Sequence, residues 1–441
     1  MSFELMAVLM FVSMLLLLLT GRHIFAVIGA VAIGFALALW GKGAEGMAFH
    51  SAITLLNWYP LMTLPLFIFM GYMFAKSGIA DNLYTMLHVW MGSIKGGLAI
   101  GTIGLMAIIA AMNGLSVAGM AIGATLALPE MLKRKYDKVM ITGVIQGGSS
   151  LGIMIPPSVV LVLYGMIARQ PIGQLWMAGA LPGFMMAGMF ILYIFIRCHL
   201  QPHLGPPLPE EERRMITWRD KFGLLRAGII PIVIIFSMTG LFLLGITSLV
   251  ECSAVGATAT TLAALANRRL TWKVMVEVID GTLKISCMFM WVVLAAMAFG
   301  AVFDGLGAVH AIEGIFIERW GLSPWGVMIM MQLSYILMGM FMDDTAMLII
   351  VAPLYVPLII KLGFNPIWYG VLYTITCQIA YLTPPFGYNL FLMKGMAPPE
   401  IKLGDIYRSI IPFVGIMIVA LAVVMLFPQI ALWLPEVYFA R

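Results

Sequence analysis

Two short stretches, residues 146–165 and 377–391, place small and hydroxyl residues beside a Pro-Pro pair in apolar surroundings. Proline removes a backbone donor and pushes the preceding residue away from helical angles, so a helix should break at each pair. A break frees carbonyl and amide groups that lipid cannot satisfy, so it must lie inside protein or face a wet cavity. Carbonyl and hydroxyl oxygens gathered there could hold a desolvated cation or a polar solute.

The composition indicates the kind of chain that carries these breaks. The protein has 441 residues, of which 62% are apolar and 10% charged, whereas soluble proteins have about 45–50% apolar and about 25% charged residues. Its length accommodates ten or more spans of about 20 residues. We therefore expect an all-α polytopic membrane protein within the lipid bilayer. The formal charge is +5, and its basic residues cluster in a few loops, as expected of a membrane protein. We therefore expect no nucleic-acid partner.

The chain also repeats itself. Its prolines recur 228 residues further along, at these positions: Pro129, Pro156 and Pro157, then Pro357, Pro384 and Pro385. We interpret residues 1–200 as a first repeat with a broken helix at 146–165, and residues 227–441 as a second with a broken helix at 374–395. Residues 201–226, rich in proline and charge, are the predicted cytoplasmic linker.

The basic residues predict how the two repeats are oriented. Arg22, the linker and the basic cluster at 267–273 should all lie in the cytoplasm, which puts the N-terminus outside. The first repeat then crosses the membrane an odd number of times, so the second begins on the opposite side. Inverted repeats with paired broken helices favour a secondary transporter that works by alternating access.

The first candidate site joins an interruption at 113–119, the expected tip of a helical hairpin, to the first break. Freed carbonyls and hydroxyls would meet there and supply the hard oxygen ligands that sodium prefers. Its members are Asn113, Gly114, Ser116, Gly148, Ser149, Ser150, Pro156 and Pro157. The alternative is that Gly and Ser merely permit close helix packing. Duplication of the pattern favours the functional interpretation.

The second candidate site joins a second hairpin tip at 339–345 to the second break. Its members are Gly339, Asp343, Asp344, Thr345, Thr383, Pro384, Pro385 and Asn389. A carboxylate at membrane depth is costly and usually faces a partner, a cavity or an ion path. Asp343 and Asp344 could be cation ligands, or one could cap the helix that follows. Both interpretations stay open.

Other classes of membrane protein fit less well. The sequence has neither the Gly-rich phosphate loop of an ATP-driven pump nor the His-Glu-x-x-His of a zinc protease. Asp343 and Asp344 are neighbours, whereas an aspartyl protease needs carboxylates from different helices. We therefore expect no enzyme. The four cysteines form neither a Cys-x-x-Cys nor a cluster with histidine, so we expect no disulfide and no bound metal of that kind. A passive channel or facilitator for small polar solutes stays an alternative, because broken helices also build selectivity filters.

Several motifs together resemble a known family. Residues 147–158 read Gly-Gly-Ser-Ser-Leu-Gly-Ile-Met-Ile-Pro-Pro-Ser, and residues 383–391 read Thr-Pro-Pro-Phe-Gly-Tyr-Asn-Leu-Phe. With residues 339–343 and 363–366, they resemble the large permease subunit of tripartite ATP-independent periplasmic (TRAP) transporters. One departure is the first tip, 114–119, which reads Gly-Leu-Ser-Val-Ala-Gly and lacks two hydroxyls usual in the family.

The resemblance implies a mechanism and partners. TRAP systems are sodium symporters of the bacterial cell inner membrane that import organic acids, C4-dicarboxylates among them, by an elevator movement. A small four-span membrane subunit and a periplasmic substrate-binding protein complete the system, and no organic cofactor is implied. The identity of the acid, the sodium stoichiometry and the binding protein are not readable from the sequence; Arg169, Lys361 and Lys394 are the candidates to receive a carboxylate.

The resemblance also implies roles for single residues. Sodium would be held by Ser116, Gly148, Ser149, Ser150, Gly339, Asp343, Thr345 and Thr383. The substrate would be held by Asn113, Gly114, Ser116, Ser149, Ser150, Pro156, Pro157, Asp344, Pro384, Pro385 and Asn389.

Overall fold

A computed structural model describes residues 3–439 apart from 19, 21, 41–42, 216, 308–320, 341–343 and 385–386. The described residues form helices and turns, with no strand among them, which confirms the expected all-α class. Five of these helical segments are long and apolar enough to cross a membrane, and a bent pair, Thr63–Lys76 and Ile79–Met91, makes a sixth if counted as one span. Shorter apolar helices of 10–17 residues accompany them.

The first half of the chain contains α1 (Phe3–Leu18), α2 (Ile24–Phe35), α3 (Ala44–Leu56), α4 (Thr63–Lys76), α5 (Ile79–Met91), α6 (Gly97–Asn113), α7 (Ser116–Ile122), α8 (Leu128–Lys133), α9 (Lys138–Ser150), α10 (Val159–Ala168) and α11 (Ile172–Leu200). A short α12 (Glu210–Met215) follows in the linker. The second half contains α13 (Trp218–Ile235), α14 (Leu241–Leu243), α15 (Leu249–Ala266), α16 (Trp272–Gly305), α18 (Pro324–Gly339), α19 (Asp344–Lys361), α20 (Pro366–Ala380), α21 (Tyr388–Met396), α22 (Leu403–Leu426) and α23 (Gln429–Phe439).

Local sequence sets many of these helix starts. A capping box begins α15, where the Ser248 hydroxyl accepts from the Glu251 amide while the Glu251 carboxylate accepts from the Ser248 amide. Proline occupies the first turn of α18 and α20, after the capping residues Ser323 and Asn365. This is the position where its missing N–H costs nothing.

Both predicted breaks are present. Helix α9 ends at Ser150, one tight turn follows, and α10 begins after Ser158, whose hydroxyl accepts from the Leu161 amide at 3.1 Å. Helix α20 ends at Ala380 and α21 begins at Tyr388, with Pro385 outside the described residues. The first hairpin tip is tighter than predicted, because only residues 114–115 are non-helical between α6 and α7. The boundaries of the two repeats stay a prediction.

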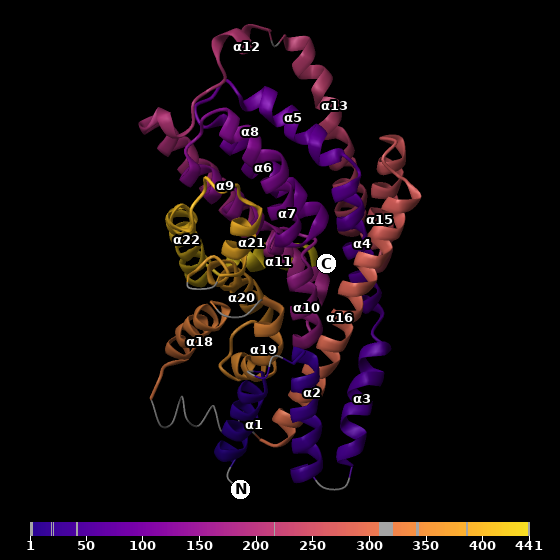
Figure 1. The fold of residues 1–441 in the computed structure, drawn as a ribbon. Coiled ribbons are helices and arrows are strands. Elements are labelled where there is room, and N and C mark those ends of the chain that lie inside the picture. Colours follow the sequence, from indigo (N-terminus) through magenta and orange to yellow (C-terminus); the bar gives the residue numbers. More distant parts are fainter. Residues whose placement is uncertain are drawn as a thin grey trace.

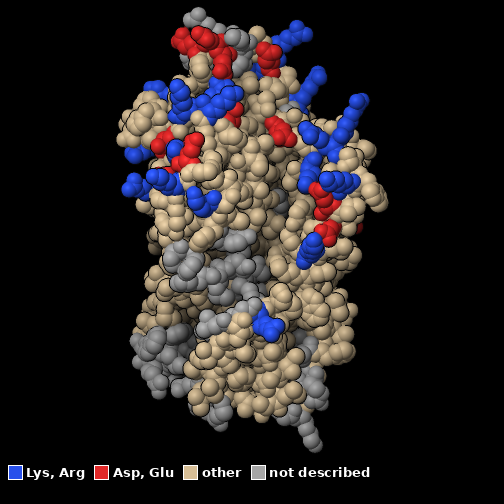
Figure 2. Space-filling model, viewed as in Figure 1, with Lys and Arg blue, Asp and Glu red and all other residues tan. Residues whose placement is uncertain are grey.

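The helices form three neighbouring groups (Figure 1). Helix α4 packs against α15 and α16 on one side, and α20 packs against α22 and α18 on the other, with α6, α9, α10 and α11 between them. The N-terminus lies at the end opposite α12 and α13. Charged side chains gather toward the end that carries α12, α13 and the α15–α16 turn (Figure 2). The described residues that this face shows at the opposite end carry few charges.

The first part of the linker is hydrogen-bonded to the turn between α5 and α6. The Gly96 amide donates to the Gly205 carbonyl at 2.8 Å, and the Leu208 amide donates to the Gly92 carbonyl at 2.8 Å. The Leu208 side chain is 3% exposed. Beyond it, the Arg134 guanidinium forms an ion pair with Glu212 at 2.6 Å.

We expect Leu208→Ala to destabilise the protein by about 2 kcal/mol, since truncating a buried leucine removes apolar contacts and leaves a cavity. The measurement is the thermal unfolding midpoint of the purified protein. The control is Leu200→Ala, because Leu200 is 74% exposed. Equal midpoints for the two variants would mean that the linker does not contribute to the folded core.

Candidate substrate and ion site

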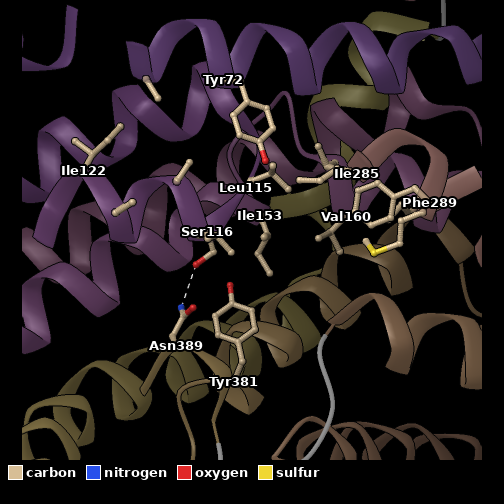
Figure 3. Close-up of a pocket in the computed structure, with 18 of the residues that line it drawn as sticks. Tyr72, Leu115, Ser116, Ile122, Ile153, Val160, Ile285, Phe289, Tyr381 and Asn389 are labelled. Atoms are coloured by element: carbon tan, nitrogen blue, oxygen red, sulfur yellow. Dashed lines mark hydrogen bonds between the residues drawn. The ribbon is translucent and has the colours of Figure 1, made fainter. Parts of the chain in front are cut away.

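A cavity of about 460 Å³ lies where the first hairpin tip, the first broken helix and the second break meet the outer helices α4 and α16 (Figure 3). The tip contributes Leu115 and Ser116, and the first broken helix contributes Ile153 and Val160. Tyr72 of α4 and Phe289 of α16 also line it, and Tyr381 and Asn389 come from the second break. Segments from both halves of the chain therefore enclose one space.

The polar groups of the cavity lie around one hydrogen bond. The Asn389 side-chain amide donates to the Ser116 hydroxyl oxygen at 3.0 Å and so joins residues of the two halves. Both side chains are buried, and Asn389 Oδ1 has no hydrogen-bond partner among the described residues. The hydroxyls of Tyr72 and Tyr381 point into the same space from opposite sides. These groups can donate to and accept from a polar ligand without an added charge.

The hairpin tip sits directly on the first break. Gly114 has a φ of +68°, and a Cβ there would lie 2.3 Å from the Pro157 carbonyl oxygen. The Val159 amide donates to the Gly114 carbonyl at 3.2 Å. Only glycine combines this left-handed conformation with so close an approach, so the tip and the break are held as one unit.

The serines of the first break lie behind this unit, outside the cavity lining. The Ser149 and Ser150 hydroxyls are buried and donate to the Gln146 and Gly147 carbonyls of their own helix. Their oxygen lone pairs remain as hard acceptors. A Cβ at Gly148 would lie 2.8 Å from Met106 Cγ, so helix packing by itself accounts for a glycine there.

Two amide side chains that the sequence analysis did not assign to the site lie beside these serines. The Gln378 amide donates to the Ser150 carbonyl at 2.8 Å, and the Gln146 amide donates to the Ser409 hydroxyl at 3.2 Å. Both glutamines are fully buried, and in the part of the chain that the structure describes neither Oε1 has a hydrogen-bond partner. Unpartnered buried oxygens are costly unless a donor or a cation meets them. A glutamine within each apolar helix, just before its break, was the sequence signal that could have identified these two residues.

Comparison with known proteins places this arrangement in a family. A family model described as the DctM component of the tripartite ATP-independent periplasmic transporter matches residues 11–430. The chain belongs to this family. It is a TRAP large permease subunit and a multi-pass membrane protein.

Individual relatives can be aligned with almost the whole chain of this TRAP permease. It is 27% identical to the C4-dicarboxylate TRAP transporter large permease protein DctM of Vibrio cholerae, over 97% of this chain and 98% of that protein. It is 28% identical to the ectoine TRAP transporter large permease protein TeaC of Halomonas elongata, over 98% and 100%.

Solved structures show the same fold for this TRAP permease at low sequence identity. Neisseria gonorrhoeae MtrF matches with a TM-score of 0.60 and 16% identity, over 91% of this chain and 85% of MtrF. Alcanivorax borkumensis YdaH matches with a TM-score of 0.60 and 13% identity, over 93% and 98%. MtrF is described as an efflux pump and YdaH as a transporter. The permease therefore shares its fold with membrane transporters.

The structure brings only part of the predicted set to the cavity of this TRAP permease. Ser116 and Asn389 line it, while Gly114 and Pro157 form the tip contact behind it. Asn113 ends α6 at that contact, Pro156 lies in the first break, and Gly339 ends α18 against Ala380.

The rest of the second candidate site is placed less fully. Pro384 is exposed, and the Thr383 hydroxyl donates to the Ile379 carbonyl at 2.6 Å. Asp343 and Pro385 lie outside the described residues, and for Asp344 and Thr345 the structure describes only the backbone, at the start of α19. The choice between ion ligand and helix cap therefore stays open for the two aspartates.

Proposed function

We propose that this permease imports an organic acid together with sodium across the bacterial inner membrane by an elevator movement. Its partners would be a small four-span membrane subunit and a periplasmic binding protein. The observation that carries the proposal is the cavity, in which a hairpin tip and a break from opposite halves face α4 and α16 and are joined by the Ser116–Asn389 hydrogen bond. Relatives named for C4-dicarboxylate and 2,3-diketo-L-gulonate support an acid as the substrate.

The described residues fit a sodium ion by their chemistry. Gln146 Oε1 and Gln378 Oε1 are buried neutral oxygens without a hydrogen-bond partner among the described residues. They lie on α9 and α20, the helices that end at the two breaks, and the Gln378 amide reaches the Ser150 carbonyl. These oxygens would coordinate sodium, and its positive charge would offset the negative charge of an incoming carboxylate. Its binding would order the hairpin tips and so favour substrate binding, and by reciprocity the substrate would tighten sodium binding.

The direct test is uptake of labelled organic acids into proteoliposomes that contain this chain and its small membrane partner. An inward sodium gradient and the periplasmic binding protein are each added or omitted. Uptake that requires both supports the proposal. Flux that follows the solute gradient without either one would instead identify a passive channel or facilitator.

Sodium coupling makes a separate prediction for Ser150→Ala and Asp343→Ala. We expect each to raise the half-saturating sodium concentration about fivefold or more, since losing one polar ligand costs about 1 kcal/mol or more. Initial uptake rates across a sodium series measure it. Ser237→Ala is the control, because its hydroxyl also donates to its own helix but lies in α13's continuation, away from the breaks. An unchanged sodium dependence in both site variants would remove those residues from the ion sites.

A further inference from the structure

The cavity walls are mainly apolar, and the hydrogen-bonded Ser116–Asn389 pair lies apart from the largest apolar side chains. Ile285 and Phe289 of α16 and Val160 of α10 lie on one side of the space, and Ser116 and Asn389 lie on another (Figure 3). Leu163 and Met288 extend the apolar wall. Such a lining removes water from a hydrocarbon group and holds one polar group at a defined end.

The cavity offers no uncompensated positive charge. Among the described lining residues Lys76 alone carries a charge at neutral pH, and its Nζ lies 2.7 Å from Glu277 Oε2 in a half-exposed ion pair. The stretches of the second tip and second break whose side chains are not described, 341–346 and 385–386, contain no Lys or Arg in their sequence. A carboxylate that leaves water without a partner charge or hydrogen bonds is strongly disfavoured. One carboxylate can be met here by the Ser116 and Asn389 donors and by the coupling cation, but a second would meet no further positive charge and at most a tyrosine hydroxyl.

The Ser116–Asn389 pair is suited to one carboxylate. The Ser116 oxygen already accepts from Asn389, so its own proton is available to donate, and the second N–H of Asn389 is available beside it. Asn389 Oδ1, without a partner among the described residues, can accept from a hydroxyl next to the carboxylate. The apolar side of the cavity then meets the remainder of the molecule.

We infer that this permease selects monocarboxylates with a branched or aromatic apolar body over small dicarboxylates. The inference rests on the proposed function and narrows its substrate class. The carboxylate binds at Ser116 and Asn389, and the apolar body packs against Val160, Ile285 and Phe289.

A matched series of three 2-hydroxy acids tests this selectivity. Lactate, 2-hydroxy-4-methylpentanoate and malate share the carboxylate and the hydroxyl, and differ in carrying a methyl, an isobutyl or a second carboxylate group. Their binding to the permease, purified with its small membrane partner in nanodiscs and sodium buffer, is measured by titration calorimetry. Measuring binding to the permease itself avoids the selectivity of the periplasmic protein. We expect 2-hydroxy-4-methylpentanoate to bind at least about tenfold more tightly than either other acid, because its isobutyl group is buried.

Variants locate the selectivity in the cavity wall. Phe289→Ala should weaken binding of 2-hydroxy-4-methylpentanoate about fivefold or more and leave lactate binding unchanged. Val160→Thr keeps the shape of the side chain but adds a hydroxyl to the apolar wall, so it should also weaken binding of 2-hydroxy-4-methylpentanoate. It serves as the test if Phe289→Ala does not fold. Phe184→Ala, at an exposed site outside the lining, is the control.

The outcomes separate the inference from the proposed function. Malate binding as tightly as 2-hydroxy-4-methylpentanoate, or a preference that survives both wall variants, overturns the inference while sodium-driven uptake of acids still stands. If none of the three acids binds and no organic acid is taken up with a sodium gradient, both are overturned.

Discussion

Replacing Gly114 with alanine is expected to reduce substrate uptake by about 100-fold or more. A left-handed backbone costs a residue with a Cβ about 1–2 kcal/mol, and the new methyl group would lie 2.3 Å from the Pro157 carbonyl oxygen. A backbone oxygen cannot rotate away, so the tip must separate from the break, at a further cost of about 1–3 kcal/mol. The total of about 3 kcal/mol corresponds to roughly 100-fold. Initial uptake rates in proteoliposomes, normalised to the amount of folded protein, measure the effect.

Gly104→Ala is the matched control for this prediction. Gly104 lies in the same helix, α6, and a Cβ there would meet nothing within 4 Å. Alanine in a helix interior is more favourable than glycine by about 1 kcal/mol, so this variant should keep wild-type uptake and unfold at the same or a higher temperature. Wild-type uptake by Gly114→Ala would show that the tip does not depend on its contact with Pro157.

Local chemistry made the breaks predictable from the sequence. Proline restricts its own and the preceding residue wherever it lies, so Pro156-Pro157 marked a break that the structure has between α9 and α10. The tip was predicted over 113–119 but occupies only Gly114 and Leu115, because Ser116 already begins a helix. A serine can start a helix or interrupt one, and its sequence alone does not distinguish the two.

Contacts between distant segments could not be predicted in the same way. Ser116 and Asn389 are 273 residues apart and meet only because the two halves pack together. Lys76 was not considered as a charged group of the site, since nothing in its sequence context shows that α4 faces the cavity. Two of the residues considered instead do not line this cavity: Arg169 lines a different one, beside Trp58, and the Lys394 ammonium donates to the Ile401 carbonyl at 2.9 Å.

The contact between Gln378 and Ser150 relates the sequence repeat to the geometry of the site. The two residues are 228 positions apart, which is the spacing of the repeated prolines, so they would occupy equivalent positions in the two predicted repeats. In a pair of repeats related by a two-fold axis, equivalent positions touch only near that axis. The two broken helices therefore meet close to the predicted axis, and the Gln378 amide links them at 2.8 Å.

Gln378→Met should accordingly lower uptake about tenfold. Methionine keeps the length and volume of the side chain but cannot donate to the Ser150 carbonyl, and losing a buried hydrogen bond costs about 1–3 kcal/mol. Uptake rate and half-saturating sodium concentration are measured together, because Gln378 Oε1 is one of the buried oxygens available to a cation.

The control for Gln378→Met is Gln170→Met, the same substitution at a glutamine whose amide donates only to the nearby Ala168 carbonyl. Loss of uptake in Gln378→Met with an unchanged sodium requirement would mean that the amide joins the two breaks but that its oxygen does not contact the ion. Wild-type uptake in Gln378→Met would contradict the link itself. Since the bond joins the two broken helices, its loss should disturb both breaks at once.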